Sequence, residues 1–323
     1  MRWGLLIATV AGFILAGYVI GSVGPWSIID AALSIGPGGF LLLILYGMLV
    51  LALLGYACFV LAPDLPIQRL PLFIWSRTTR EAAAEVLPFS QFGGLVIGAR
   101  TLVAGGVPSP IVYAAMVADL TMEMAAQLLF TFFGIAMLGL SLAQGETSEP
   151  VWPLALSGLA AAVLITAAYA FLQRPMIEIA GRLGERLLPG ARIKAQAVRQ
   201  QLDALYRRPL PICTGFLFNL LAWVASAMGA WIALRLMGID IPLLAVLTIE
   251  SLVFALRSVA FLVPGALGLQ EAAYALLGPL FGLDAETAVA LSLLKRARDL
   301  AIGLPALLFW QIEESRRLLI ADA

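Results

Sequence analysis

Long apolar stretches separated by short polar ones run along almost the whole chain. A hydrocarbon core roughly 30 Å thick needs about 20 helical residues to cross it. Five stretches reach that length: residues 3–23, 38–62, 111–140, 152–172 and 211–236. Each is predicted to be a membrane-spanning helix. A further apolar block begins at Ile241 and is interrupted, and its last part, residues 285–311, is predicted to be the final span.

Composition agrees with this pattern and excludes several classes of chemistry. Of the 323 residues, 62% are hydrophobic and only 12% are charged, about half the charged share of a soluble domain. The chain is therefore predicted to be an all-α, polytopic membrane helix bundle forming one transmembrane domain. It contains no histidine and no Cys-x-x-Cys pair, which removes imidazole bases and the usual metal and redox sites. We expect no metal, no cofactor and no nucleic-acid partner.

The basic residues are distributed unevenly between the connections. Lys and Arg gather in residues 69–80 and 173–208, whereas residues 24–37 and 143–151 contain none. Cytoplasmic loops carry the excess of Lys and Arg. The two basic connections are therefore predicted to be cytoplasmic and the two connections without Lys or Arg external. The arginines near both termini place the N and C termini in the cytoplasm.

Residues 87–106 are rich in helix-breaking residues: Pro88, Gly93, Gly94, Gly105 and Gly106. The basic residues 69–80 before this segment are predicted to be cytoplasmic, and the next span, residues 111–140, must end at residues 143–151 on the other side. The segment therefore begins and ends on the cytoplasmic face, so it is predicted to be a re-entrant hairpin. Irregular backbone at membrane depth survives only where it lines a cavity or is buried in protein. The alternative is a kinked ordinary helix. The amphipathic stretch before it, "LPLFIWSRTTREAAAEVLPF", is predicted to be an interfacial helix.

The chain resembles itself at an offset of 176 residues. The coincident pairs are Pro88 with Pro264, Gly106 with Gly282, Ala114 with Ala290 and Glu123 with Asp299. Three spans separate equivalent points, and an odd number means that the second copy is inverted. We therefore predict about six full spans plus two re-entrant helical hairpins in an inverted 3+3 repeat. Repeat 1 covers about residues 1–140 and repeat 2 about 152–311, and such repeats are typical of carriers.

Two segments of the second half remain to be assigned. The second hairpin, about residues 241–282, could be re-entrant or could form two full spans. The cytoplasmic connection, residues 173–210, has apolar residues at helical spacing and is divided by Pro189 and Gly190. It is predicted to form two surface helices whose basic faces meet anionic headgroups. The alternative is a solvated linker.

Placing an ionisable side chain inside a membrane span costs free energy, so each such residue is expected to have a structural or functional role. Asp119 and Glu123 are four residues apart, as are Lys295 and Asp299. We predict a charge network in which the two acids face Lys295, Arg296 or Arg298, with Asp299 as a member. The alternative is that all these groups pair off to hold the bundle together. The polar residues of the hairpins and one arginine of the last span are predicted to bind an anionic or polyhydroxyl headgroup: Gln91, Arg100, Glu250, Arg257, Gln270, Glu271 and Arg296.

Two long motifs carry a resemblance to a known family. "WSRTTREAAAEVLPFSQFGGLVIGARTLVAGGVPSP" and "FLVPGALGLQEAAYALLGPLFGLDAETAVALSLLKRARDL" resemble the signature regions of the lysylphosphatidylglycerol synthetase transmembrane, or flippase-like, family. The first is similar to its hopanoid-biosynthesis-associated branch. The resemblance implies a lipid-translocating domain with paired re-entrant helices. The family motifs match Pro264, Gly265, Gly268 and Glu271 in the second hairpin, Gly93, Gly94 and Arg100 in the first, and Arg296 on the last helix.

The resemblance also sets the expected function, and the chain departs from the family pattern in two places. Full synthetases continue into an aminoacyl-transferase domain, so aminoacylation is not expected of a chain ending at Ala323. Many relatives have Glu-Arg where this chain has Asp119-Leu120. We expect a non-enzymatic lipid carrier of the bacterial inner membrane that moves or presents hopanoid or an anionic phospholipid, with hopanoid-pathway proteins as possible partners. The alternatives are an intramembrane lipid-modifying enzyme and a non-catalytic scaffold.

Overall fold

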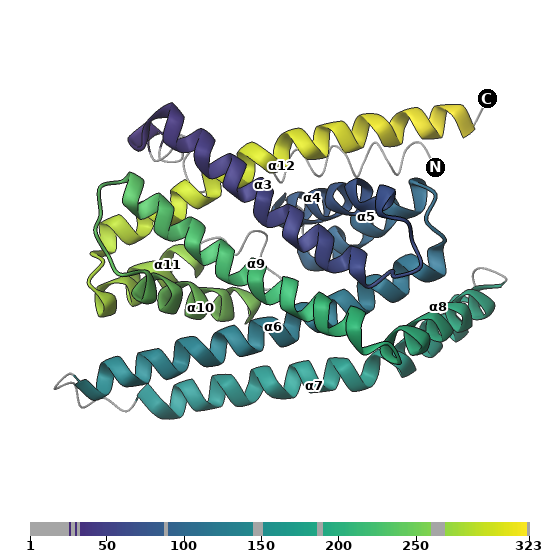
Figure 1. Cartoon of the computed structure of the whole chain (residues 1–323), viewed down its shortest axis with the longest axis horizontal. Coiled ribbons are helices and arrows are strands. Elements are labelled where there is room, and N and C mark those ends of the chain that lie inside the picture. The colour runs from purple at the N-terminus through teal and green to yellow at the C-terminus, as the bar shows by residue number, and fades with distance from the viewer. Residues whose placement is uncertain are drawn as a thin grey trace. The chain divides into compact units, whose positions relative to one another are not determined.

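The computed structural model describes residues 33–86, 90–144, 151–185, 190–259 and 269–321, together with Trp26 and Asp30. These residues form helices and turns without any strand (Figure 1), which confirms the predicted all-α class. The α-helices are α3 (Gly36–Val60), α4 (Leu70–Val86), α5 (Ser90–Ala104), α6 (Ser109–Gln144), α7 (Val151–Gly184), α8 (Ala191–Tyr206), α9 (Pro209–Leu236), α10 (Leu243–Val259), α11 (Leu269–Leu277) and α12 (Ala285–Ala321). Short 3-10 helices occur at Ile67–Arg69 (η1) and Gly278–Phe281 (η3).

Three helices in the described part of the chain are long and apolar enough to cross a membrane: α3, α6 and α9. They coincide with the predicted spans 38–62, 111–140 and 211–236, so the membrane character of the chain is confirmed. The predicted spans 152–172 and 285–311 lie within α7 and α12. The predicted span 3–23 lies outside the described residues.

The helix bounds follow the 176-residue offset found in the sequence. The offset carries Ser109, the first residue of α6, onto Ala285, the first residue of α12. It also carries Val60, where α3 ends, onto Leu236, where α9 ends. Gly106 and Gly282 have φ angles of +86° and +84°, a conformation that glycine adopts without a steric cost. The two halves thus place their helix ends and a left-handed glycine at equivalent positions. The inversion of one half relative to the other stays a prediction.

Contacts divide the chain into two compact units, each built from separate segments. Unit 1 comprises Met1–Leu51, Ser76–Gly98 and Ser226–Ala323, and unit 2 comprises Ala52–Trp75 and Ala99–Ala225. These units do not coincide with the predicted repeats, because each takes helices from both halves of the sequence.

Helices α4 and α5 pack closely against each other and run antiparallel. In unit 1, a Cβ placed on Gly94 would lie 2.5 Å from the carbonyl oxygen of Arg80, and the Ser76 hydroxyl donates a 2.8 Å hydrogen bond to the carbonyl of Gly98. A later residue of α5 thus contacts an earlier residue of α4, as expected of antiparallel helices. In unit 2, the Arg69 guanidinium donates to the carbonyl of Gly105 at 2.7 Å.

This pairing corrects one prediction about the first hairpin. The predicted break at Gly93 and Gly94 is wrong, because α5 is continuous through both residues. Helix α4 covers the amphipathic stretch, and its position at the membrane surface stays a prediction. Glycine inside a helix costs about 1 kcal/mol relative to alanine, and here it permits close backbone contact instead of ending the helix. Pro88 lies outside the described residues.

Replacing Gly94 with alanine should push α4 and α5 apart and lower the free energy of unfolding by about 1–3 kcal/mol, the usual range for overpacking. The reason is that the new methyl group would meet the backbone of Arg80 instead of a movable side chain. Detergent-induced unfolding of the purified protein, followed by tryptophan fluorescence, measures the change. Gly38→Ala is the matched control, since no atom lies within 4 Å of its added Cβ. Equal stability of the two variants would contradict the close packing.

The connection 173–210 also differs from its prediction. Helix α7 continues to Gly184 through Pro175, so the first predicted surface helix is an extension of the predicted span. The second surface helix exists as α8, which packs against α6 and α7 (Figure 1). Its apolar residues Val198, Leu202 and Leu205 are buried. They therefore stabilise unit 2, and the solvated-linker alternative is wrong. The contact of the basic face of α8 with anionic headgroups stays a prediction.

Candidate functional site

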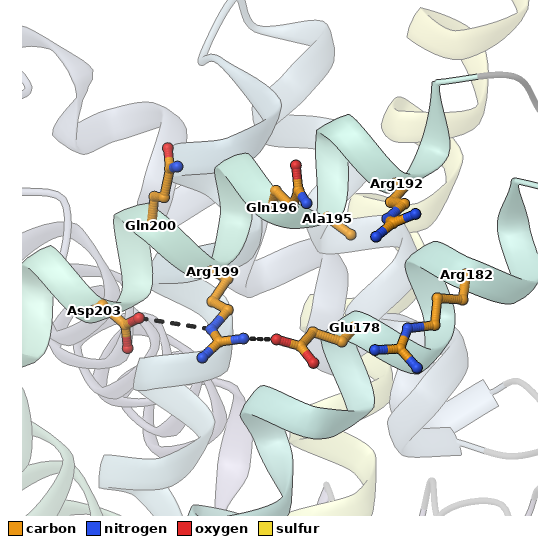
Figure 2. Close-up of a pocket in the computed structure, with 8 residues that line it drawn as sticks. All are labelled: Glu178, Arg182, Arg192, Ala195, Gln196, Arg199, Gln200 and Asp203. Atoms are coloured by element: carbon orange, nitrogen blue, oxygen red, sulfur yellow. Dashed lines mark ion pairs between the residues drawn. The ribbon is translucent and has the colours of Figure 1, made fainter.

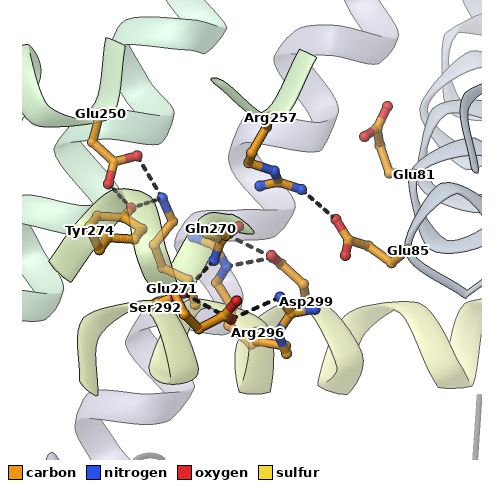
Figure 3. A network of polar contacts seen from close by, with 12 residues as sticks. Glu81, Glu85, Glu250, Arg257, Gln270, Glu271, Tyr274, Ser292, Arg296 and Asp299 are labelled. Carbon is orange, nitrogen blue, oxygen red and sulfur yellow. Dashed lines mark hydrogen bonds and ion pairs between the residues drawn. The ribbon is translucent and has the colours of Figure 1, made fainter. Parts of the chain in front are cut away.

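Unit 1 contains a set of buried and partly buried charged and polar side chains, which we call the hairpin charge network (Figure 3). Helices α10 and α11 and the 3-10 helix η3 pack together, and α11 and η3 also contact α12. The C-terminal half of α4 belongs to the same unit. The members of the network are Glu85, Glu250, Arg257, Gln270, Glu271, Tyr274, Ser292, Lys295 and Arg296.

A triad from three helices forms the most deeply buried part of the network. The Lys295 ammonium donates to Glu250 at 2.5 Å and to the Tyr274 hydroxyl at 2.6 Å, and Tyr274 donates to the other carboxylate oxygen of Glu250. Glu250 and Tyr274 are completely buried and Lys295 is 4% exposed. The ammonium also lies 5.1 Å from the centre of the Phe254 ring. Such a closed arrangement satisfies both charges without water, as burial in an apolar bundle requires.

A second carboxylate–arginine pair is less enclosed. Arg296 donates to Glu271 at 2.9 Å, and the Ser292 hydroxyl donates to the same oxygen at 3.2 Å. Gln270 donates to Ser292 at 2.8 Å. The side chain of Arg296 is 4% exposed but that of Glu271 is 19% exposed. The buried Arg296 thus fixes the Glu271 carboxylate by an ion pair, while part of the carboxylate surface remains accessible.

Two further arginines contribute to unit 1. Arg257 of α10 donates to Glu85 of α4 at 3.0 Å, with both side chains 23% exposed. Arg298 donates to the neighbouring Asp299 at 2.7 Å. A Cβ on Gly47 of α3 would lie 3.2 Å from the Arg298 side chain, and one on Gly229 of α9 would lie 3.7 Å from it. The absence of a side chain at Gly47 leaves room for the Arg298 side chain, whereas a Cβ at Gly229 would be in ordinary contact with it.

The sequence prediction missed the cations of α4. Arg77 and Arg80 were assigned to the cytoplasmic connection and its interfacial helix and not to a site, but both are 4% exposed. Glu81 lies 2.9 Å from Arg77 and 4.0 Å from Arg80. The four-residue spacing of Arg77 and Glu81 was a usable signal, because such pairs share a helix face. Tyr274 and Ser292 gave no comparable signal, since nothing local marks an uncharged side chain as the partner of a buried ion.

The remaining predicted residues have separate positions. Arg100 is exposed on α5 and belongs to unit 2, so its approach to Glu271 stays a prediction. Asp119 is completely buried and accepts a 3.1 Å hydrogen bond from Asn219 within unit 2. The predicted contact of Asp119 and Glu123 with the α12 cations also stays a prediction, although Lys295, Arg296 and Arg298 each have an acidic partner in unit 1. Pro264, Gly265, Gly268 and the side chain of Gln91 lie outside the described residues.

The network can bind polar groups, and its residue types restrict the chemistry further. In the parts of the chain that the structure describes, no group of three His, Cys, Asp or Glu side chains is placed to hold a metal. Its carboxylates and guanidiniums accept and donate charge-assisted hydrogen bonds. A partly accessible carboxylate beside a buried arginine suits recognition of hydroxyl or amine groups.

The helices and their enclosed charges define an all-helical membrane protein with a polar site inside its helix bundle. The family model of the lysylphosphatidylglycerol synthase TM region matches residues 3–306, and the chain belongs to this family. The family indicates a membrane protein involved in lipid handling. No curated protein and no solved structure matches the chain.

Proposed function

We propose that this protein is a lipid carrier of the flippase type, which moves or presents hopanoid or a related phospholipid in the bacterial inner membrane. The observation that carries the proposal is the pair Glu271–Arg296, a carboxylate and a guanidinium 2.9 Å apart in a chain of which only 12% of the residues are charged. Ionisable groups at membrane depth are costly, and they mark substrate or ion pathways. The carboxylate retains accessible surface, so a headgroup can reach it.

The proposal includes the predicted topology of six spans and two re-entrant hairpins in an inverted repeat. The equivalent helix ends at the 176-residue offset support it. The ion pair between Arg257 and Glu85 supports it too, because it joins α10 of the second hairpin to α4 of the first. Glu85 lies near the C-terminal end of α4, and Arg257 lies near the C-terminal end of α10. In carriers built this way, the substrate site lies between the two broken elements near the bilayer midplane.

Reconstitution into liposomes tests the function directly. Fluorescent phosphatidylglycerol and a fluorescent hopanoid polyol are incorporated in turn, and dithionite quenching reports their leaflet distribution. We expect redistribution faster than in protein-free liposomes and no change in lipid mass. A lipid of altered mass would replace the proposal with an intramembrane enzyme that uses Glu271 or Asp119 with Arg296. Unchanged distribution and unchanged mass for both lipids would favour a scaffold for hopanoid biosynthesis.

The orientation can be tested with single cysteines. In a chain whose Cys58 and Cys213 are replaced by alanine, Ser148→Cys should react with a membrane-impermeant maleimide added outside intact cells. Arg207→Cys should react only after the membrane is permeabilised, because residues 173–208 carry the excess of basic residues expected of a cytoplasmic connection. Labelling of Arg207→Cys in intact cells would overturn the topology.

A further inference from the structure

A second polar site, distinct from the hairpin charge network, lies in unit 2 between the C-terminal turns of α7 and the helix α8 (Figure 2). It is an open pocket of roughly 420 Å³. Its lining residues are Glu178, Arg182, Arg192, Ala195, Gln196, Arg199, Gln200 and Asp203. We call it the α7–α8 pocket. Neither its arginines nor its glutamines are used in the function proposed above.

The charges of the pocket are only partly balanced. Arg199 forms ion pairs with Glu178 and with Asp203, and Asp203 also accepts from Arg174 at 2.8 Å. Both carboxylates of the lining are therefore engaged. Within the described part of the chain, Arg182 and Arg192 form no ion pair. Figure 2 shows these two side chains on the same side of the pocket, one from each helix.

The nearby acid Glu185 is occupied with the backbone of α8. Its carboxylate accepts the N–H groups of Gly190 and Arg192 at 2.9 and 2.8 Å. These two hydrogen bonds hold the pKa of the Glu185 carboxyl below its usual value. Glu185 thus caps the helix, and its charge lies near Arg192. An anion entering the pocket would meet the two guanidiniums and the amides of Gln196 and Gln200 instead of free backbone N–H groups.

Exposed apolar side chains occupy the same helices as the pocket. Phe171, Met176 and Ile179 of α7 are 81%, 58% and 53% exposed, and Ile193 of α8 is 72% exposed. Ile179 precedes Arg182 by three residues and Phe171 precedes Glu178 by seven, spacings that place side chains on one helix face. A ligand held by the arginines would therefore lie beside an apolar surface. This combination suits an amphiphile better than a free ion.

We propose that the α7–α8 pocket binds the phosphate group of an anionic phospholipid, with Arg182 and Arg192 as its main contacts and the acyl chains along the exposed apolar residues of α7. Planar guanidinium groups bind phosphate oxygens in a bidentate manner. The whole segment 173–208 carries eight basic and three acidic residues, so it attracts anionic headgroups before a specific contact forms. This pocket is separate from the hairpins that we propose to transport lipid, so lipid binding in the pocket does not depend on that transport.

Binding of a short-chain lipid to the purified, full-length protein tests the proposal. Dihexanoyl phosphatidylglycerol is titrated in a neutral detergent by calorimetry, with dihexanoyl phosphatidylcholine and inorganic phosphate as comparison ligands. We expect one phosphatidylglycerol per chain. The double variant Arg182→Ala/Arg192→Ala should bind it roughly tenfold to a hundredfold more weakly, as expected for the loss of charge-assisted hydrogen bonds. Arg182→Lys/Arg192→Lys should fall between the two, because it keeps the charge but not the planar fork.

The control variant Arg207→Ala/Arg316→Ala removes two exposed arginines and leaves the pocket unchanged. Its binding should match that of the wild type, and circular dichroism should show the same helix content in all variants. Equal losses in the control and pocket variants would overturn the site in favour of general electrostatic attraction. Binding of inorganic phosphate as tight as that of phosphatidylglycerol would overturn the lipid assignment. Equal affinity for phosphatidylcholine would overturn the role of the anionic charge.

Discussion

Replacing Glu250 with glutamine should lower the free energy of unfolding by about 3–5 kcal/mol, the cost of breaking a buried ion pair by removing one partner. Glu250 is completely buried and its carboxylate receives both the Lys295 ammonium and the Tyr274 hydroxyl. The variant leaves the ammonium enclosed without a counter-charge. Unfolding by sodium dodecyl sulfate in mixed micelles, followed by tryptophan fluorescence, measures the loss.

The double variant Glu250→Gln/Lys295→Met separates an ion pair from two independent effects. With both charges removed, no uncompensated ion remains, so the loss should be smaller than the sum of the single losses by about 2 kcal/mol or more. Asp240→Asn is the control, because Asp240 and Arg235 form a 2.7 Å ion pair with side chains 83% and 45% exposed. An exposed pair of this kind is worth at most about 1 kcal/mol. Strictly additive losses at Glu250 and Lys295 would show that the pair does not stabilise the bundle.

Glu271→Gln should slow lipid redistribution in liposomes by roughly tenfold to a hundredfold while the protein folds and inserts normally. The carboxylate receives Arg296 and Ser292 and remains 19% exposed, so the amide keeps the shape but loses the negative charge. A charge-assisted hydrogen bond is worth about 1.5–3 kcal/mol, and each 1.4 kcal/mol of barrier corresponds to a factor of about ten in rate. Dithionite quenching of fluorescent lipid measures the rate.

Two companion variants make this result specific. Glu313→Gln applies the same substitution to an exposed carboxylate of the same helix as Arg296, and it should keep the wild-type rate. Arg100→Ala should lose redistribution as Glu271→Gln does, if both hairpins contact the headgroup. In a hopanoid-producing cell, total hopanoid should persist while its placement or later modification changes. Full redistribution in both Glu271→Gln and Arg100→Ala, at normal abundance, would show that these charges are structural.

Local patterns in the sequence predicted the positions of most helices. Hydropathy depends only on neighbouring residues, so the spans 38–62, 111–140 and 211–236 could be placed within a few residues of α3, α6 and α9. The 176-residue offset was found without any structure, and the structure adds that it also relates the starts of α6 and α12 and the ends of α3 and α9. The same local reasoning failed at Gly93 and Gly94, because helix-breaking residues are tolerated where packing or neighbouring groups offset their cost.

The sequence by itself determined that the chain is a helical membrane protein of the lysylphosphatidylglycerol synthase TM family, with charges enclosed among apolar segments. Only the tertiary structure decided which charges meet. Lys295 and Asp299 are four residues apart, yet Lys295 pairs with Glu250, 45 positions away, and Asp299 pairs with its neighbour Arg298. Helix periodicity states which face a side chain occupies but not which helix packs against that face. The packing of α10, α11 and α12 supplied that choice, because each buried ion must find its partner within the bundle.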